Sequence, residues 1–313
     1  LSDFSLCLRK LINSQISKTM QIISDSTRLR TALNEERGKS RSLAFVPTMG
    51  NLHKGHMELV KHAKSLADIV VVSIFVNPLQ FSSNEDLEKY PRTLSTDKAL
   101  LFSEGINTLF VPSEIDIYPN GQEQETTIVV PEISKILCGK DRPGLFEGVA
   151  TVVTKLLNLV TPDYAVFGEK DYQQLSIIRK LVHDLKFETN IVAVGTVRDD
   201  DGLALSSRNM YLNEDERKLA PLLFDTLAHC RDAIASGFDN FLELESHARF
   251  ELIESGFSLD YFTILDAQTL SEITEDTKEI SILVAARLGE TRLIDNVRIS
   301  VNTTTDWGIL AAQ

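Results

Sequence analysis

Short apolar runs alternate with amphipathic segments along the chain from about residue 42. The runs at 42–48 and 69–76 are continuous enough to be strands buried on both faces of a sheet. Between them, residues 56–67 repeat apolar side chains at helical spacing, which predicts a helix. This order of strand, helix and strand is typical of a parallel sheet with crossover helices.

The same alternation continues to about residue 211. We expect a helix followed by a strand in 97–112 and again in 146–168, then a helix at 171–186 and a strand at 190–197. Right-handed crossovers would stack these strands into an open, doubly wound parallel sheet of the Rossmann type. Ligands bind such α/β sheets in a crevice at the carboxyl ends of the strands, so we look for function there.

The pattern changes after about residue 212. Two helical stretches, 213–236 and 241–255, come first, and Asn213 and Glu216 have the spacing of a capping box. Three strand-like runs follow, at 259–265, 279–288 and 291–299, with Gly289 between the last two. We expect antiparallel strands in a smaller α+β domain.

Three segments are therefore expected: an N-terminal extension over 1–19, a Rossmann-like domain over 20–211, and a smaller C-terminal domain over 212–313 that acts as a lid. The extension carries three basic residues against one acid, with four serines, a composition shared by organellar import peptides. An upstream extension that is disordered or loosely helical is the simpler interpretation, so we leave it out of the fold argument.

Composition narrows the class of protein. The net charge of −13, the pI near 5.0 and the absence of any run of five basic residues argue against nucleic acid or a membrane surface as partner. An anionic substrate would need a local cationic pocket. Three widely spaced cysteines indicate neither a zinc site nor a disulfide framework, and no apolar stretch reaches the length of a membrane span. We expect a soluble, cytoplasmic protein without a structural metal.

The stretch "VPTMGNLHKGH" at 46–56 lies where the first strand gives way to a helix. A turn through Met49–Leu52 would expose backbone amides, and the positive end of the helix would point to the same place, which favours phosphate. His53 and His56 could stabilise charge on a phosphate chain. Alternatively, one is a solvated loop residue and the other an ordinary helix-start residue, and spacing alone does not decide between these interpretations.

The stretch "FGEKD" at 167–171 also follows a strand and precedes a helix. Gly168 would allow close backbone approach, and Lys170 would supply a positive charge for phosphate oxygens. Asp171 and Gln174 have the spacing of a capping box, which would also account for both residues. Capping and substrate binding are compatible roles.

The stretch "DGLALSSRN" at 201–209 is a third loop behind a strand. Ser206 and Ser207 could donate hydrogen bonds to a nucleotide, and Arg208 could pair with phosphate, in a mobile loop that closes over the ligand. A Ser-Ser-Arg sequence alone is more often just a polar loop. Three such loops at successive strand ends would nevertheless be gathered by the fold in one place.

The stretch "FVNPLQF" at 75–81 carries Asn77 and Gln80, uncharged amides that could orient a small hydroxylated substrate, although Asn-Pro also simply marks a turn. Arg142 either lines the pocket or is a surface charge. The remaining histidines lie in helical segments without companion groups and are interpreted as structural or solvated: His62, His183, His229 and His247.

Seven stretches together resemble the pantothenate synthetase family, the AMP-forming pantoate-beta-alanine ligases of the nucleotidylyltransferase superfamily. They are "FVPTMGNLHKGH", "VVVSIFVNPLQF", "YPRTL", "RPGLFEGVATVVTKL", "FGEKDYQQL", "DGLALSSRN" and "ILVAARLGETRLIDN", in family order. The resemblance implies ATP-dependent condensation of (R)-pantoate with β-alanine to pantothenate. Pantoyl adenylate is the implied intermediate, and pyrophosphate and AMP are released.

The resemblance also implies site residues. It assigns catalytic roles to His53, His56, Lys170 and Arg208, with His56 as the proton donor. It implies substrate binding by Gln80, Gln174 and Asn77. The implied ATP contacts are Met49, Gly50, Asn51, Leu52, His53, Lys54, Gly55, His56, Gly168, Glu169, Lys170, Asp171, Val197, Leu205, Ser206, Ser207 and Arg208.

Mg²⁺ with the ATP, a homodimer, and small-molecule substrates as the only other partners are further expectations from the resemblance. Two alternatives stay open at this point. One is a nucleotidylyltransferase that leaves its nucleotide on the product, and the other is a nucleotide-binding module without catalysis.

Overall fold

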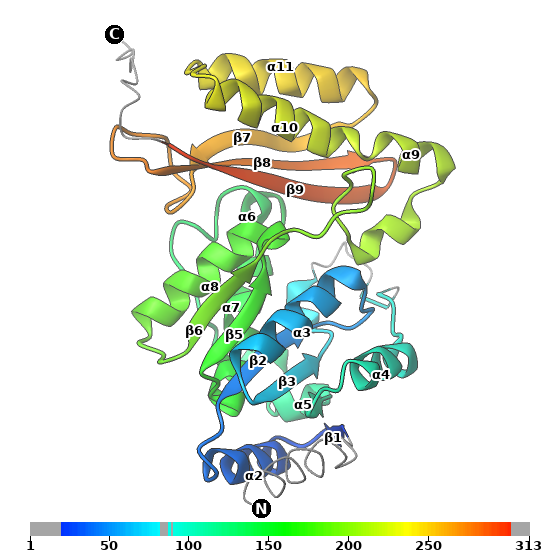
Figure 1. Ribbon diagram of the computed structural model, residues 1–313, viewed down its shortest axis with the longest axis vertical. Coiled ribbons are helices and arrows are strands. Elements are labelled where there is room, and N and C mark those ends of the chain that lie inside the picture. The colour runs from blue at the N-terminus through cyan, green and yellow to red at the C-terminus, as the bar shows by residue number, and fades with distance from the viewer. Residues whose placement is uncertain (1–19, 82–86, 89, 302–313) are drawn as a thin grey trace, which may run out of the picture.

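The computed structural model of the protein describes residues 20–81, 87–88 and 90–301 (Figure 1). The expectation for the extension at 1–19 lies outside these residues. Six strands form one parallel sheet in the order β1-β4-β3-β2-β5-β6. Their bounds are β1 Gln21–Ile23, β2 Leu43–Thr48, β3 Ile69–Ile74, β4 Thr108–Phe110, β5 Tyr164–Gly168 and β6 Asn190–Val194.

Helices cover both faces of this sheet, as the doubly wound prediction requires. One face packs against α2 (Ser26–Arg37), α7 (Leu145–Val160) and α8 (Tyr172–Asp184), and the other against α3 (Lys54–Leu66) and α4 (Leu94–Ser103). Shorter turns of helix connect them: η1 Pro78–Gln80, α5 Glu114–Ile117, η2 Gln122–Gln124, α6 Cys138–Asp141, η3 Glu169–Asp171 and η4 Ser207–Tyr211.

Strand β2 shows why the sheet needs two helical layers. Leu43 and Phe45 point into the core beneath α2 and α7, whereas Ala44 and Val46 point into the core beneath α3. All four side chains are buried, because successive residues of a strand face opposite sides of the sheet. The continuous apolar run in the sequence is therefore the signature of burial on both faces.

The order of the strands fixes where a ligand can bind. From β2 the chain runs through β3 and β4 toward one edge, then returns to add β5 and β6 on the other side of β2. The direction of winding thus changes between β2 and β5. The carboxyl ends of these two strands, at Thr48 and Gly168, flank the crevice that doubly wound sheets use for ligands.

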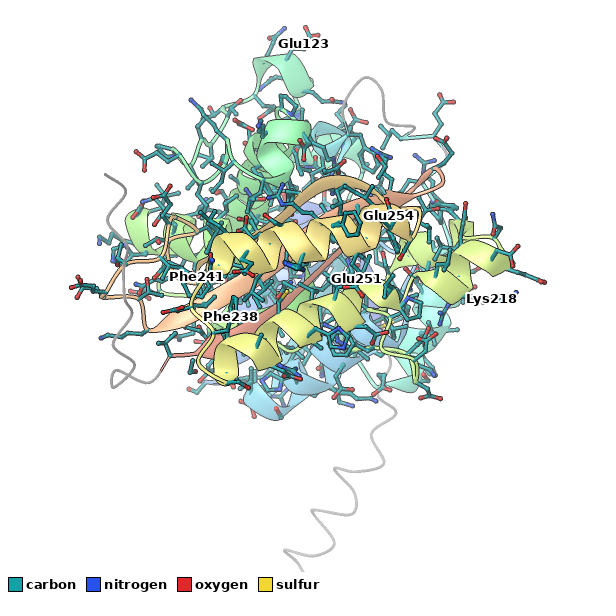
Figure 2. All side chains as sticks on the ribbon, turned by 90° about the horizontal axis from the view of Figure 1, so that it is seen from above. Glu123, Lys218, Phe238, Phe241, Glu251 and Glu254 are labelled. Atoms are coloured by element: carbon teal, nitrogen blue, oxygen red, sulfur yellow. The ribbon has the colours of Figure 1, made fainter. Side chains whose placement is uncertain are left out.

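A second sheet of three antiparallel strands lies above the first (Figure 1). It consists of β7 (Ser258–Asp266), β8 (Glu279–Leu288) and β9 (Thr291–Ser300). Helices α10 (Leu222–Ala235) and α11 (Phe241–Glu254) pack on its outer face, and Figure 2 shows the two side by side above the strands. The opposite face turns toward the parallel sheet. The hairpin expected across Gly289 is confirmed.

Two differences from the sequence expectations have simple causes. The helical stretch expected over 213–236 is divided into α9 (Glu214–Leu219) and α10, with Pro221 at the break, since proline lacks the amide hydrogen that an uninterrupted helix needs there. The capping box at Asn213 is confirmed at the start of α9. Strand β1 is three residues long, and neither it nor α2 was anticipated.

Among the described residues, no helix combines the length and apolar character needed to cross a membrane.

Candidate active site

A cleft of about 1010 Å³ opens at the carboxyl ends of β2 and β5. Three segments far apart in sequence form its walls: the turn and first residues of α3, the turn from β5 into α8, and the loop from 195 to 208. These are the three loops expected to converge, and they do. His53, His56, Lys170 and Arg208 all line this one cleft.

A second cavity of about 880 Å³ adjoins the first and extends beneath β8 and β9. Gln80, Cys138 and Arg292 are among its lining residues. The two cavities share one wall, formed by Met49, Lys170, Asp171, Gln174, Ser206 and Arg208. The pair is therefore one continuous site with two compartments.

Hydrogen bonds at the start of helix α3 fix the orientation of the two histidine rings. His53 is the N-cap residue, and its Nδ1 accepts a hydrogen bond from the Gly55 amide at 3.1 Å. Nδ1 of His56 in turn accepts from the His53 amide at 3.3 Å. The ring centroids are 4.1 Å apart. Because each Nδ1 accepts, each neutral ring carries its proton on Nε2, so both offer a donor rather than a base.

Burial keeps the two rings neutral. Desolvation is the main reason that the pKa of His56 falls from 6.5 to about 3, and the neighbouring His53 ring and Lys170 act in the same direction, against an opposing effect of Asp171. Desolvation, followed by Lys170, also lowers the pKa of His53. At neutral pH the site therefore offers two uncharged N–H donors. A polyanion bound beside them would shift both pKa values upward and favour proton transfer.

The amides of the turn before α3 are arranged differently from the expectation. The Asn51 and Leu52 amides donate to the buried carboxylate of Asp97, at 3.0 and 2.9 Å, and the Gly50 amide donates to the Thr48 hydroxyl. These amides are therefore occupied and do not form a phosphate nest. The turn instead serves as the support for the histidines, with Asp97 of α4 as its brace.

The turn requires glycine at position 50. Its φ of +82° is in the left-handed region, which favours glycine, and a Cβ there would approach the Asp97 carboxylate to 3.2 Å and an Ile74 methyl to 3.1 Å. The tight turn that lets Asp97 reach two amides thus depends on a missing side chain.

Lys170 and Arg208 are half-buried in the cleft wall, and neither forms an ion pair with any residue that the structure describes. Lys170 lies in the short helix η3, just before α8. The capping box expected for Asp171 and Gln174 does not form, because the Asp171 side chain makes no capping hydrogen bond. Asp171 instead lies exposed at the shared wall of the two compartments.

The loop that carries Arg208 is fastened at its base. Backbone hydrogen bonds join Leu205 to Val197 and Asp199 to Leu203, which closes residues 197–205 into a tight hairpin. The Ser206 hydroxyl accepts from the Arg208 amide and caps η4. The Ser207 hydroxyl donates to the Asn51 carbonyl and so ties this loop to the histidine turn. Both hydroxyls serve local structure as well as facing the cleft.

Asn77 differs from the expectation of direct substrate contact. It is fully buried, and its amide donates to Gly148 O and Gln80 Oε1 while its Oδ1 accepts from the Tyr118 hydroxyl at 2.7 Å. These bonds fix the amide of Gln80, whose oxygen faces Asn77, leaving its NH₂ group as the donor toward the cavity. Asn77 is therefore a support for Gln80.

Two neighbouring glutamines of α8 have separate tasks. Gln174 is half-buried and lines both compartments. Gln173 is buried, donates to the carbonyls of Ile133 and Ile136, and accepts from the Cys138 amide, which anchors the segment before α7.

Arg142 lines the second compartment and donates to the Gln80 carbonyl at 3.0 Å, which favours the pocket interpretation.

Five residues of the expected ATP set do not line the nucleotide cleft. Leu52 packs in the core, Lys54 is exposed on the helix, and Glu169 pairs with Arg298. Gly50 and Asn51 form the turn beneath the histidines. The other twelve members of the set line the cleft: Met49, His53, Gly55, His56, Gly168, Lys170, Asp171, Val197, Leu205, Ser206, Ser207 and Arg208.

Sequence reasoning missed three polar residues that support the site: Asp97, Asp295 and Asn296. Each is at most 6% exposed and sits within an otherwise apolar face. Two features of the sequence could have revealed them: a carboxylate on the buried stripe of a helix and an Asp-Asn pair inside an apolar strand. Buried polar side chains of this kind need hydrogen-bond partners. The four remaining histidines are exposed, as expected.

No group of three or more His, Cys, Asp or Glu side chains among the described residues could hold a metal ion.

Comparisons with known proteins agree on one family. A family model described as pantoate-beta-alanine ligase matches residues 21–298. The pantothenate synthetase of Marinobacter nauticus is 51% identical over 90% of this chain and 100% of the relative, and that of Stutzerimonas stutzeri is 50% identical over 91% and 100%.

Solved structures give the same result. The pantothenate synthetase of Thermus thermophilus is 43% identical, with a TM-score of 0.83 over 89% of this chain and 99% of that one. A pantoate-beta-alanine ligase from Francisella tularensis, in complex with βγ-ATP and β-alanine, is 37% identical, with a TM-score of 0.73 over 89% and 97%.

Proposed function

The chain belongs to the pantoate-beta-alanine ligase family, and from that premise we propose that its two-compartment site joins (R)-pantoate to β-alanine through pantoyl adenylate. ATP supplies the driving force and leaves as AMP and pyrophosphate. The product is pantothenate. One observation carries the assignment of the site: two cations and two neutral imidazole donors, brought from three loops, face one cleft of a protein with a net charge of −13.

The first step places the triphosphate in the cleft at the ends of β2 and β5. The pantoate carboxylate attacks the α-phosphorus, a P–O bond forms, and the bond to the β-phosphate breaks to release pyrophosphate. Lys170 and Arg208 offset the charge that develops on the transferred phosphorus and the leaving group. His53 and His56 donate Nε2–H to the same oxygens. Both rings are neutral in the absence of ligand, and they become protonated more readily when the bound polyanion raises their pKa values.

The acyl substrate occupies the second compartment. Gln80 and Gln174 donate hydrogen bonds to the hydroxyls and carboxylate of pantoate and orient it without an ion pair that would weaken the nucleophile. In the second step the amine of β-alanine attacks the acyl carbon, the bond to the AMP phosphate breaks, and the nitrogen loses its proton. The wall shared by the two compartments is where both steps occur.

Magnesium enters as Mg·ATP. The described residues offer no cluster of three or more metal ligands, and Asp171 is the one carboxylate among the described residues that line the cleft. Phosphate oxygens and water would supply most of its coordination, as is usual for Mg²⁺ on nucleotides, and the ion would screen phosphate charge.

A homodimer and a cytoplasmic location complete the proposal. Both are supported by the likeness to the family rather than by a contact in the structure. Sedimentation of the purified chain and fractionation of cells that produce it are the direct tests.

Pantoate-dependent exchange of labelled pyrophosphate into ATP tests the first step. We expect His56→Ala and Lys170→Ala to lower the exchange rate by about 10²-fold or more at saturating substrates. Lys61→Ala and His62→Ala, at exposed positions of α3 that do not line the cleft, are matched controls and should exchange normally.

Analysis of the products distinguishes the ligase from the two alternative functions. Free AMP that forms only when β-alanine is present supports the ligase. A stable product that keeps the nucleotide would identify a nucleotidylyltransferase, and ATP binding without any exchange would identify a non-catalytic module. Normal exchange in both cleft variants would refute the assigned residues.

A further inference from the structure

Strand β9 contacts both loops of the nucleotide cleft. It is one of the two edge strands of the antiparallel sheet, and its residues contact η3 and η4 below it. Asn296 contacts η3, which carries Lys170, and Asp295 contacts the hairpin that leads to Arg208. Both side chains are buried, at 6% and 4% exposure. Strand β9 belongs to the smaller domain that we expected to act as a lid. It contacts the Lys170 turn and the hairpin that leads to Arg208.

Asn296 grips the turn that carries Lys170. Its Nδ2 donates two hydrogen bonds, to the carbonyls of Glu169 at 2.9 Å and Lys170 at 3.0 Å. The two carbonyls fix which end of the amide points at the turn, because only the NH₂ end can donate. η3 has no side-chain cap of its own at Gly168. The orientation of the peptide from which the Lys170 side chain starts is therefore set from β9.

Neighbouring contacts reinforce this grip. Arg298, two residues further along β9, pairs with Glu169 in the same turn and with Glu279 of β8 at 3.0 Å. Asp295 forms a two-point ion pair with Arg198, at 2.5 and 2.9 Å, at the base of the hairpin. The Arg198 guanidinium also stacks 3.8 Å above the Phe224 ring of α10. β9 thus links both loops to one rigid element.

We propose that Asn296 is a positioning residue that acts through Lys170, so that the antiparallel sheet sets the phosphate-contacting geometry of the parallel sheet. This inference rests on the proposed function, in which Lys170 offsets charge in the adenylation step. Asn296 also lines the second compartment, but its amide NH₂ group donates to the two carbonyls of the turn. It holds the backbone that aims the lysine, and the energetic effect appears where the lysine acts, in the transition state of the first step.

A double-mutant cycle tests this proposal. Pyrophosphate exchange is measured in the full chain and in three variants: Asn296→Ala, Lys170→Ala and the double variant. We expect Asn296→Ala to lower the maximal exchange rate roughly tenfold with the KM for pantoate unchanged, and to have little further effect once Lys170 is absent. Labelled pyrophosphate keeps the slow variants measurable.

Two further variants separate positioning from folding. Asn296→Asp keeps the shape of the side chain but cannot donate to the carbonyls, so its rate should fall at least as far as that of Asn296→Ala. Val297→Ala removes part of the core beneath α10 without touching η3, so its urea midpoint should fall while its exchange rate stays normal. Circular dichroism at the assay temperature confirms that each variant is folded.

The outcomes distinguish the two proposals. Multiplicative losses in the double variant, or a normal rate in Asn296→Ala or Asn296→Asp, would overturn the positioning role while leaving the proposed function intact. A normal rate in Lys170→Ala would overturn the role of the lysine and the inference together. A loss in Val297→Ala as large as that in Asn296→Ala would show that general loosening of the sheet explains the effect.

Discussion

The half-buried pair of histidines makes the stability of the protein depend on pH in a way that one substitution can isolate. The folded protein keeps the His56 pKa at about 3, whereas an unfolded histidine has a pKa near 6.5. Between these values the unfolded chain takes up a proton that the folded chain refuses. Acid therefore favours unfolding, and the stability contributed by this ring is lost as the pH falls below about 6.5.

His56→Gln removes the titrating group and keeps the local structure. Glutamine at the third position of a helix can accept from the amide of the N-cap residue, as the His56 ring does now. One proton corresponds to about 1.4 kcal/mol per pH unit, so the wild type should lose at most about 2 kcal/mol more than the variant between pH 6.5 and 5. Solvent reaching the half-buried ring reduces this figure.

Urea unfolding at pH 7.5, 6.5, 5.5 and 5.0 measures the difference. The free energy of unfolding of His56→Gln, relative to wild type, should rise steadily as the pH falls through this range. His62→Gln removes an exposed histidine from the same helix and provides the control, with no such trend expected. A constant difference between wild type and His56→Gln at all four pH values would show that burial does not hold the ring neutral.

Two further predictions concern side chains that support the site. Asp97→Ala leaves two amides of the histidine turn without an acceptor and should lower the free energy of unfolding by about 2–4 kcal/mol, measured by urea titration at pH 7.5. Asp97→Asn, which keeps one acceptor, should lose about half as much, and an unchanged midpoint in either variant contradicts the bracing role. Tyr118→Phe removes the hydroxyl that orients Asn77 beneath Gln80 and should raise the KM for pantoate about fivefold, the equivalent of one hydrogen bond, with the KM for ATP unchanged. A normal KM for pantoate would show that Gln80 needs no such support.

The sequence predicted the parts of the fold that depend on local pattern. The apolar runs of β2 and β3 required burial on both faces, and parallel winding then placed the ends of β2 and β5 together. This arrangement alone predicts that the histidine turn, Lys170 and Arg208 converge. The identities of the substrates came from the family resemblance and not from the pattern.

The supports of the site could not be predicted in the same way. Asp97 braces amides 45 and 46 residues earlier, and Asn296 holds carbonyls 126 and 127 residues earlier. No spacing rule reaches that far along a chain. The apparent capping box at Asp171 fails because η3 runs directly into α8, which leaves Asp171 at φ −93° and ψ 58° instead of in the extended conformation of a usual N-cap. Local rules cannot anticipate a partner supplied by another sheet.

The late position of β9 in the sequence also affects how the protein folds during synthesis. The strand occupies Thr291–Ser300, so the ribosome delivers it after all the other described elements of both sheets. The parallel sheet already has most of its own core and can fold while synthesis continues. Until β9 emerges, however, the lysine turn and the arginine hairpin lack the side chains that hold them. A nascent or prematurely terminated chain would therefore be compact yet unable to consume ATP.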